Sequence, residues 1–407
     1  MTAVPARDSV VFNPFTPEFK NDPYAHYAEL RRHAPVHDHP LGFWLLSRYD
    51  DVRDLLRSGM SVEQRNVGPG PFRKTYEYAD VPIEPRLNGL AMLDRDPPGH
   101  TRLRKLVAKV FTPRAIEGME PLVRELVGDA LDDLAVEGGG DLVPSLAFPL
   151  PFTVISRMLG MPPTDEDRLR ALTDTLMRSV EPVSGPEVLR AVQAADVELT
   201  AMIGEAVAWK RRHPGDDLLT ALLAAEEGGD VLSNDELVAQ VTLLYVAGHE
   251  TTVNLISNGT VALLRHPEQL ELLRTRPDLE DNAIEELLRY DTAVHISRRV
   301  TLEPYEVGGR VIPARSFVLA NLASANRDEA FFGPDSEELK LDRPKARRQL
   351  SFGSGIHFCL GAALARLEGK VAIGELVRRF PGLRLDGEVE WNDRISLRGP
   401  TRLPVRL

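Results

Sequence analysis

The feature that most constrains the fold is a long apolar stretch between Asn234 and His266. Ser233, with Glu236 three residues later, predicts a capping box at its start, and Pro267 predicts its end. Apolar side chains fall on nearly every helical face: Val241, Leu243, Leu244, Val246, Val253, Leu255, Ile256, Val261 and Leu263. A helix of this length extends roughly 50 Å, enough to cross a whole domain. We therefore expect a central, buried helix with the rest of the chain wrapped around it.

Helical patterns dominate the remaining sequence as well, and they predict a mainly α fold with a smaller β region. The predicted helices span 22–33, 49–58, 100–110, 113–136, 151–159, 165–180, 186–212 and 216–226. The predicted strands lie at 43–46 and within 298–322, with a hairpin turn at 307–310. Segment 61–90 is interrupted by proline and glycine and predicts a long irregular loop. Such loops often line functional sites, although a tolerated surface insertion is the alternative.

The overall composition predicts one large domain covering residues 1–407. No Gly/Ser-rich linker, low-complexity tract or repeat of fixed period divides the sequence. No apolar run reaches the length of a membrane span, and residues 1–15 lack the pattern of a signal peptide, so we expect a cytoplasmic protein with no membrane partner. The net charge of −12 argues against a general affinity for nucleic acid.

A polar interruption, Ala247-Gly248-His249-Glu250-Thr251-Thr252, lies in the middle of the apolar helix. A helix kept only for packing would avoid an interior glycine and buried polar groups. Small residues leave room beside a flat cofactor, and a threonine hydroxyl that bonds a carbonyl one turn back loosens the helix, so that water or dioxygen can enter. Glu250 and Thr251 form an acid–alcohol pair suited to relaying protons. We interpret His249 as a packing or substrate-side residue; a simple solvated kink is the alternative.

The only cysteine, Cys359, lies in the segment Phe352-Gly353-Ser354-Gly355-Ile356-His357-Phe358-Cys359-Leu360-Gly361. One cysteine forms no internal disulfide and is too few thiols for a structural zinc site. The glycines allow close approach of the backbone, and a thiol before a helix N-terminus is expected to favour its thiolate form. The pattern suits a single soft anionic ligand beneath a flat group, such as haem iron. The alternative without a catalytic or ligand role is a buried structural cysteine in a glycine-rich turn.

These two segments together resemble motifs of the cytochrome P450 family. Phe352, Gly353, His357, Cys359 and Gly361 fit the cysteine-ligand loop F-G-x-G-x-H-x-C-x-G, with no fixed position missing. The helix interruption resembles the distal-helix motif A-G-x-[D/E]-T-T, and the resemblance extends in order from about residue 21 to the C-terminus. It implies the cytochrome P450 fold, with the long helix over haem and Cys359 as the iron ligand.

The resemblance also implies roles for individual residues. Ala247 and Gly248 would lie beside the haem, Thr251 would stabilise bound dioxygen, and Glu250 would help to deliver protons. Contacts to the haem propionates are implied for the pair His100 and Arg104, four residues apart on one helical face, and for Arg299 and His357.

Two further segments resemble structural motifs of the family. Glu286 and Arg289 fit its E-x-x-R pair, which we assign to core structure rather than chemistry. Residues 339–344 resemble its meander, although Leu341 stands where an aromatic residue is usual. The third member of the ion-pair triad, for which Arg343 is a candidate, therefore stays open.

The activity implied by the resemblance is that of a soluble bacterial monooxygenase of secondary metabolism. Haem b would be held non-covalently, since no C-x-x-C-H motif exists. The enzyme would use O2 to hydroxylate or epoxidise a hydrophobic small molecule. The implied pocket is lined by 61–90, 170–185, 243–248, 294–297 and 395–397, and within or beside it Arg65, Arg73, Arg86 and His295 are potential polar contacts but more typical of surface or loop positions.

Nothing in the sequence resembles a flavin or nicotinamide domain, so electrons are expected from a separate acidic ferredoxin and its reductase. The predicted docking surface is a basic patch, for which an ordinary solvated face is the alternative: Lys345, Arg347, Arg348, Arg366 and Lys370.

Two other functions compete with this interpretation. One is a thiol hydrolase with Cys359 as nucleophile and His357 as base, which lacks an evident orienting group. The other is a haem-binding sensor without turnover, against which the Glu250–Thr251 pair argues. A peroxide-driven or dehydrating enzyme remains an alternative within the family.

Overall fold

The computed structural model describes residues 10–407 except 71–72, 75–76, 78–79, 81–86, 163–164, 183 and 228. The helices are α1 (Pro17–Asn21), α2 (Pro23–His33), α3 (Tyr49–Arg57), α5 (Gly99–Ala108), α6 (Pro113–Glu117), α7 (Glu120–Glu137), α8 (Pro149–Leu159), α9 (Glu166–Met177), α10 (Pro186–Arg212), α11 (Leu218–Leu223), α12 (Asn234–Arg265), α13 (Pro267–Thr275), α14 (Glu280–Tyr290), α15 (Leu322–Ala325), α16 (Glu329–Phe332) and α17 (Ala362–Arg379). The strands are β1 (Val36–Asp38), β2 (Phe43–Leu46), β3 (Gly139–Asp141), β4 (Glu226–Glu227), β5 (Asp230–Val231), β6 (Ile296–Val300), β7 (Tyr305–Val307), β8 (Arg310–Ile312), β9 (Phe317–Asn321), β10 (Arg384–Leu385), β11 (Glu390–Trp391), β12 (Pro400–Arg402) and β13 (Pro404–Arg406). The mainly α architecture with a smaller β region is confirmed.

The long helix α12 begins and ends where the sequence predicts. The Ser233 hydroxyl accepts from the Glu236 amide, and the Glu236 carboxylate accepts from the Ser233 amide at 2.9 Å, which completes the capping box. Pro267 opens α13 directly after the end of α12. Most of α12 is buried against α8, α10, α14 and α17, and a Cβ at Gly259 would lie only 2.9 Å from the Ile373 side chain of α17. This close approach fixes α12 against the helix that follows the cysteine segment.

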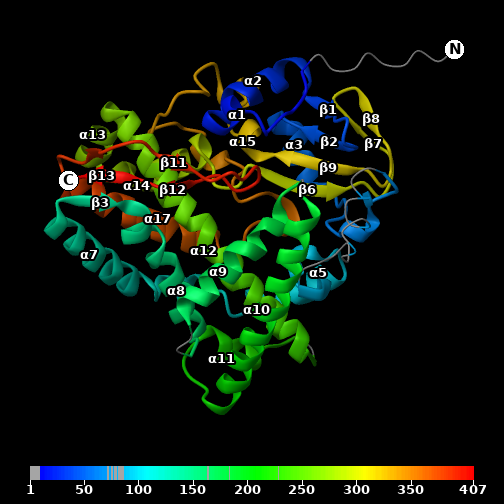
Figure 1. Ribbon diagram of the computed structural model, residues 1–407, viewed down its shortest axis with the longest axis horizontal. Helices are drawn as coiled ribbons and strands as arrows, with labels where there is room; N and C mark the ends of the chain where they lie inside the picture. Colours follow the sequence, from blue (N-terminus) through cyan, green and yellow to red (C-terminus); the bar gives the residue numbers. More distant parts are fainter. Residues whose placement is uncertain are drawn as a thin grey trace.

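The main sheet lies to one side of the helices, at the upper right in Figure 1. Its strand order is β1-β2-β9-β6, with β2 and β9 parallel although they are far apart in the sequence. β6 pairs antiparallel with β9, and this pairing places Arg299 opposite Val318. The predicted hairpin turn is confirmed between β7 and β8, where Gly308 and Gly309 have φ of 55° and 76°.

Several predicted boundaries were wrong. The predicted helix 113–136 is divided into α6 and α7, and Gly118 and Met119 lie between them. Predicted helix 165–180 leaves α-helical geometry after Met177 and ends in a 3₁₀ turn at Arg178–Val180. Predicted helix 216–226 shortens to α11, because its last residues pair as β4 with β5. Part of the predicted loop 61–90 lies outside the described residues; a 3₁₀ turn at Gln64–Asn66 lies within it. None of the described helices combines the length and apolarity of a membrane span.

Candidate functional site

The polar interruption of α12 is the place where this buried helix opens to solvent. Ala247 is exposed and Gly248, Glu250 and Thr251 are half-buried, whereas the preceding residues 237–246 are all buried. A Cβ at Gly248 would meet only the Ile155 side chain, at 3.7 Å. The small residues therefore leave free space along one side of α12, as the sequence predicts.

Both threonines donate to the backbone one turn earlier. Thr251 Oγ1 lies 2.9 Å from the Ala247 carbonyl oxygen, and Thr252 Oγ1 lies 3.2 Å from that of Gly248. The α-helix nevertheless continues through both threonines to Arg265. Each hydroxyl bonds a carbonyl oxygen one turn back, as the sequence predicts.

Glu250 is held by an arginine that sequence reasoning missed. Its carboxylate forms an ion pair with Arg394, which lies in the segment between β11 and β12. Burial raises the pKa of Glu250, while Arg394 lowers it and Asp174 raises it further. His249, in contrast, is a packing residue: its ring makes an edge contact with Phe148 at 4.3 Å, and burial lowers its pKa to about 4.

The cysteine segment makes a tight turn before α17. The Cys359 amide donates to the Phe352 carbonyl oxygen at 2.9 Å. Gly353 and Gly355 have φ of 71° and 74°, and a Cβ at Gly355 would lie 2.6 Å from the Leu56 carbonyl oxygen. The Cys359 side chain itself is exposed. The turn thus presents a single thiol at the surface of the segment.

The expectation that the protein alone favours the thiolate is wrong. Surrounding protein raises the pKa of Cys359 through desolvation, which outweighs the lowering by the Gly361 amide, Arg104 and Arg366. Cys359 precedes α17 by three residues, so the helix N-terminus offers little beyond one amide contact. A cation bound at the sulfur would reverse this balance, because a coordinating thiol is deprotonated.

Four basic side chains gather beside the cysteine segment: His100, Arg104, Arg299 and His357. The rings of His100 and His357 lie 4.2 Å apart, and neither ring nitrogen of His100 has a hydrogen-bond partner among the residues that the structure describes. Arg299 is buried and donates to the Arg298 carbonyl oxygen at 2.6 Å, while Arg104 donates to that of Phe358 at 2.7 Å. Among the described residues, none of the four forms an ion pair with a carboxylate.

This basic cluster is electrostatically incomplete. Burial, followed by Arg299, His100 and Arg104, lowers the pKa of His357 to about 3. Burial, with Arg298 second, lowers the pKa of Arg299 to about 10. The nearby carboxylates are engaged elsewhere: Asp94 with Arg298 at 2.7 Å, and Asp96 with the Ser61 hydroxyl and the Val62 amide. Buried arginines close to one another, together with hydrogen-bond donors that have no partner in the described residues, would be stabilised by a ligand that carries carboxylates. Haem has two such groups, its propionates.

The same cluster argues against the thiol hydrolase. A general base needs a pKa near the working pH, and the lowered pKa of His357 leaves it a very weak base. His357 also packs against the ring of another histidine rather than against an orienting carboxylate.

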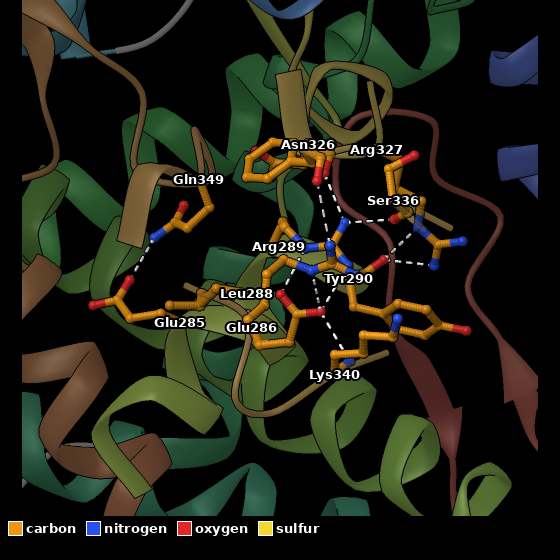
Figure 2. Close-up of polar contacts among 12 residues, drawn as sticks. Glu285, Glu286, Leu288, Arg289, Tyr290, Asn326, Arg327, Ser336, Lys340 and Gln349 are labelled. Atoms are coloured by element: carbon orange, nitrogen blue, oxygen red, sulfur yellow. Dashed lines mark hydrogen bonds and ion pairs between the residues drawn. The ribbon is translucent and has the colours of Figure 1, made fainter. Parts of the chain in front are cut away.

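The E-x-x-R pair forms a fully buried network (Figure 2). Arg289 Nε and Nη2 lie 2.6 and 2.7 Å from the two carboxylate oxygens of Glu286, and both side chains have an exposed fraction of 0%. Arg289 also donates to the carbonyl oxygens of Asn326 and Ser336. Arg343 bonds Glu286 at 3.0 Å, which answers the open question of the third member. The network joins α14 to the 326–343 region that precedes the cysteine segment.

The predicted basic patch is partly neutralised. Arg366 pairs with Glu285 and Lys370 with Asp281, each at 2.7 Å. The remaining cations, Lys345, Arg347 and Arg348, form no ion pair within the described part of the chain. These three still provide an excess of positive charge near the cysteine segment.

Of the possible polar substrate contacts, Arg65 is an ion-pair partner of Glu63, and Arg73 donates to the Val67 carbonyl oxygen at 3.0 Å. Arg86 lies outside the described residues. His295 lies in a loop position directly before β6, but it is buried and hydrogen-bonded to Tyr27 at 3.0 Å, so the surface alternative is wrong for this residue. The predicted site residues thus lie in two places, one along α12 and one around the cysteine segment.

The chain is similar to known proteins over nearly its whole length. The family model described as cytochrome P450 matches residues 185–387. Cytochrome P450 107B1 of Saccharopolyspora erythraea is 42% identical over 404 residues, covering 96% of each chain. Cytochrome P450 monooxygenase PikC of Streptomyces venezuelae is 41% identical, covering 96% of this chain and 92% of its own.

A solved structure of similar fold is the bacillaene polyketide synthase cytochrome P450 PksS of Bacillus subtilis. It is 35% identical, with a TM-score of 0.86, and the match covers 98% of this chain and 100% of that one. Similarity of sequence and of structure therefore extends over nearly the whole molecule. The chain belongs to the cytochrome P450 family of haem-thiolate monooxygenases.

Proposed function

We propose that this enzyme binds haem b and hydroxylates or epoxidises a hydrophobic secondary metabolite, with electrons from a separate ferredoxin and its reductase. The observation that carries the proposal is the exposed Cys359 thiol beside a buried basic cluster that lacks carboxylate partners. Few ligands other than haem would satisfy at once a soft metal ligand, two arginines without carboxylate partners and two histidine rings able to donate hydrogen bonds.

In this proposal the protein holds haem at two kinds of contact. Cys359 would ligate the iron, with Phe352, Gly353 and Gly361 shaping the turn around the sulfur. His100, Arg104, Arg299 and His357 would bind the propionates. When bound, the haem supplies the oxidising chemistry that activates O2. Gain of two carboxylates would also relieve the like-charge repulsion within the basic cluster.

On α12, two side chains would manage protons. The Thr251 hydroxyl, which donates to the Ala247 carbonyl oxygen, lies on the open side of the helix; there it would accept from an ordered water, or rotate away from Ala247 to donate to dioxygen. Glu250 has a raised pKa, so it exchanges protons closer to neutral pH than an ordinary carboxylate does. Together they would carry protons from solvent inward and keep other water away from the reacting atoms.

A matched pair of threonine variants tests this assignment. Thr251→Ala should lower the amount of product formed per electron consumed and release hydrogen peroxide in proportion. The control is Thr252→Ala, which removes an equivalent hydroxyl from the buried side of the helix. Equal coupling in wild type and Thr251→Ala would contradict the role of Thr251.

The substrate class is supported by the apolar composition of the implied pocket and by the relatives. Leu243, Leu244 and Val246 precede the open side of α12, and apolar lining favours apolar ligands. PksS is named as a polyketide synthase P450, and we extend that class to this enzyme. Spectral titration and turnover with a macrolactone, testosterone and myristic acid test the proposal. Preference for the macrolactone is expected; turnover of none of the three would contradict it.

The electron donor is proposed to dock on the three unpaired cations. Reversing the charge of Arg347 and Arg348 to glutamate should weaken ferredoxin-driven turnover, most strongly at low salt, without changing substrate binding. The same exchange at the paired Lys370 is the control and should have a smaller effect. Turnover in the double variant with the rate and the salt dependence of wild type would exclude this docking surface.

A further inference from the structure

Arg394 connects three parts of the molecule. One terminal nitrogen of its guanidinium pairs with Glu250 of α12, and the other lies 2.5 Å from a carboxylate oxygen of Asp174 in α9. It also donates to the Asp174 carbonyl oxygen at 3.3 Å. The exposed fractions are 12% for the Arg394 side chain, 16% for Glu250 and 65% for Asp174. The contact to α12 is therefore shielded, whereas the contact to α9 lies at the surface.

The residues after Arg394 form a second connection to the end of α9. The Glu181 carboxylate accepts from the amides of Ile395 and Ser396, at 2.8 and 3.2 Å. The Ser396 hydroxyl donates to the Val180 carbonyl oxygen at 3.1 Å. Segment 394–396 thus binds both Asp174 within α9 and the turn that follows that helix.

On its other side, the same segment is fixed to the sheet region. The His295 amide donates to the Ser396 carbonyl oxygen at 2.8 Å, and Val294 pairs with Leu397. Because main-chain bonds hold this side, segment 394–396 is a fixed support. The contacts to α9 rest on side chains, so α9 is the partner that can separate from it.

The Arg394 guanidinium therefore interacts with three carboxylates. It forms ion pairs with Glu250 and Asp174, and it is close enough to Glu181 for an electrostatic interaction. Asp174 and Glu250 compete for its charge, and the presence of Asp174 raises the pKa of Glu250. If α9 separated from the segment, Arg394 would pair with Glu250 alone and hold it as a carboxylate. With α9 in place, Arg394 is shared and Glu250 releases and regains its proton more readily.

We propose that Arg394 is a positioning residue that makes the proton-delivering state of Glu250 depend on the docking of α9 against segment 394–396. The inference rests on the proposed function, in which Glu250 delivers protons. Its consequence is that proton delivery becomes efficient only when α9 covers the site. Each proton leaves the Glu250 carboxyl group toward the Thr251 side and is replaced from solvent, so the residue is unchanged after a turnover.

The first measurement is hydrogen–deuterium exchange on the haem-loaded enzyme without substrate. In Arg394→Gln, the amides of 395–396 and of the C-terminal turn of α9 should exchange faster, on the order of five- to tenfold. Asp174→Asn should give a smaller increase at α9 alone. Arg402→Gln, which breaks an exposed pair with Glu390 at 3.4 Å in the same C-terminal region, is the control. Unchanged exchange in Arg394→Gln would overturn the proposal.

The second measurement is product formed per electron, made with the compound of the three-member panel that is turned over fastest. Arg394→Gln should lower this ratio and increase the solvent isotope effect on turnover, and Arg394→Lys should restore the ratio only in part, because one ammonium cannot span both carboxylates. A normal ratio in Arg394→Gln, alongside a lowered one in Glu250→Gln, would overturn the proposal but not the proposed function. A normal ratio in Glu250→Gln would overturn the proton role itself, whatever the exchange data show.

Discussion

Two glutamate–arginine clusters in this molecule have the same chemistry and opposite surroundings. Glu286 and Arg289 are fully buried, and their hydrogen bonds are completed by Arg343 and by backbone carbonyl groups. Glu250 and Arg394 are only partly buried, and their third partner, Asp174, is mostly exposed. A saturated buried network fixes structure, because every alternative leaves a charge unpaired. A cluster with an exposed member retains a second arrangement, which is what a proton relay requires.

The largest effect is expected from breaking the saturated cluster. Arg289→Ala leaves the buried Glu286 carboxylate with Arg343 as its one remaining cation and removes five hydrogen bonds made by Arg289. We expect a loss of about 3–5 kcal/mol in the free energy of unfolding, measured by denaturant titration of the haem-loaded protein. Arg276→Ala, which removes an exposed pair with Asp278, should change the free energy of unfolding far less than Arg289→Ala. Comparable stability of the two variants would contradict the contrast between buried and exposed pairs.

Glu368 in α17 shows what a buried carboxyl group does without a cation. Burial raises its pKa from 4.5 to about 8, and its Oε2 atom has no hydrogen-bond partner. Between these values the unfolded chain ionises while the native protein keeps the proton, so stability falls as the pH rises through this window.

Replacing this carboxyl group by a neutral amide should remove the pH dependence. Glu368→Gln should be more stable than wild type by about 3–5 kcal/mol at pH 9, with the difference vanishing near pH 4. Thermal unfolding at several pH values measures this, with exposed Glu117→Gln as control. A constant difference across pH would show that Glu368 is ionised in the native state.

A smaller loss is expected at the third member of the saturated cluster. Arg343→Gln leaves the Glu286–Arg289 pair intact and removes bonds to Glu286 and to Asp335 at 2.9 Å. We expect a loss of about 1–2 kcal/mol in the same titration. A loss as large as that of Arg289→Ala would mean that the three residues act as one unit, which a double variant would reveal.

The smallest effect on stability is expected in the second cluster. Asp174→Asn should change the free energy of unfolding by less than about 1 kcal/mol, because the carboxylate is exposed. The contrast is sharpened if this variant alters product formed per electron while Arg343→Gln does not. If Asp174→Asn lowers the stability but leaves the product formed per electron unchanged, the cluster around Arg394 has a structural role and not a role in proton delivery.

Structural features that depend on neighbouring residues could be predicted from the sequence, whereas contacts between residues far apart in the sequence could not. Capping chemistry located the ends of α12, and the spacing of Phe352 to Gly361 identified the cysteine turn, because both depend on neighbouring residues. Arg394 was missed, since its partner Glu250 lies 144 positions away and no local pattern marks it. The pKa of Cys359 was predicted in the wrong direction because desolvation by the surrounding protein, which depends on the tertiary fold, outweighs the helix terminus. The burial of His295 likewise depends on distant residues such as Tyr27.

The central claim is that Cys359 holds haem iron as a thiolate. The direct test is the absorption spectrum of the purified protein after reduction with dithionite and exposure to carbon monoxide. A Soret band shifted strongly to the red, as thiolate-ligated haem gives, is the predicted result. No haem band after expression with a haem precursor, or a band without that shift, would contradict the account.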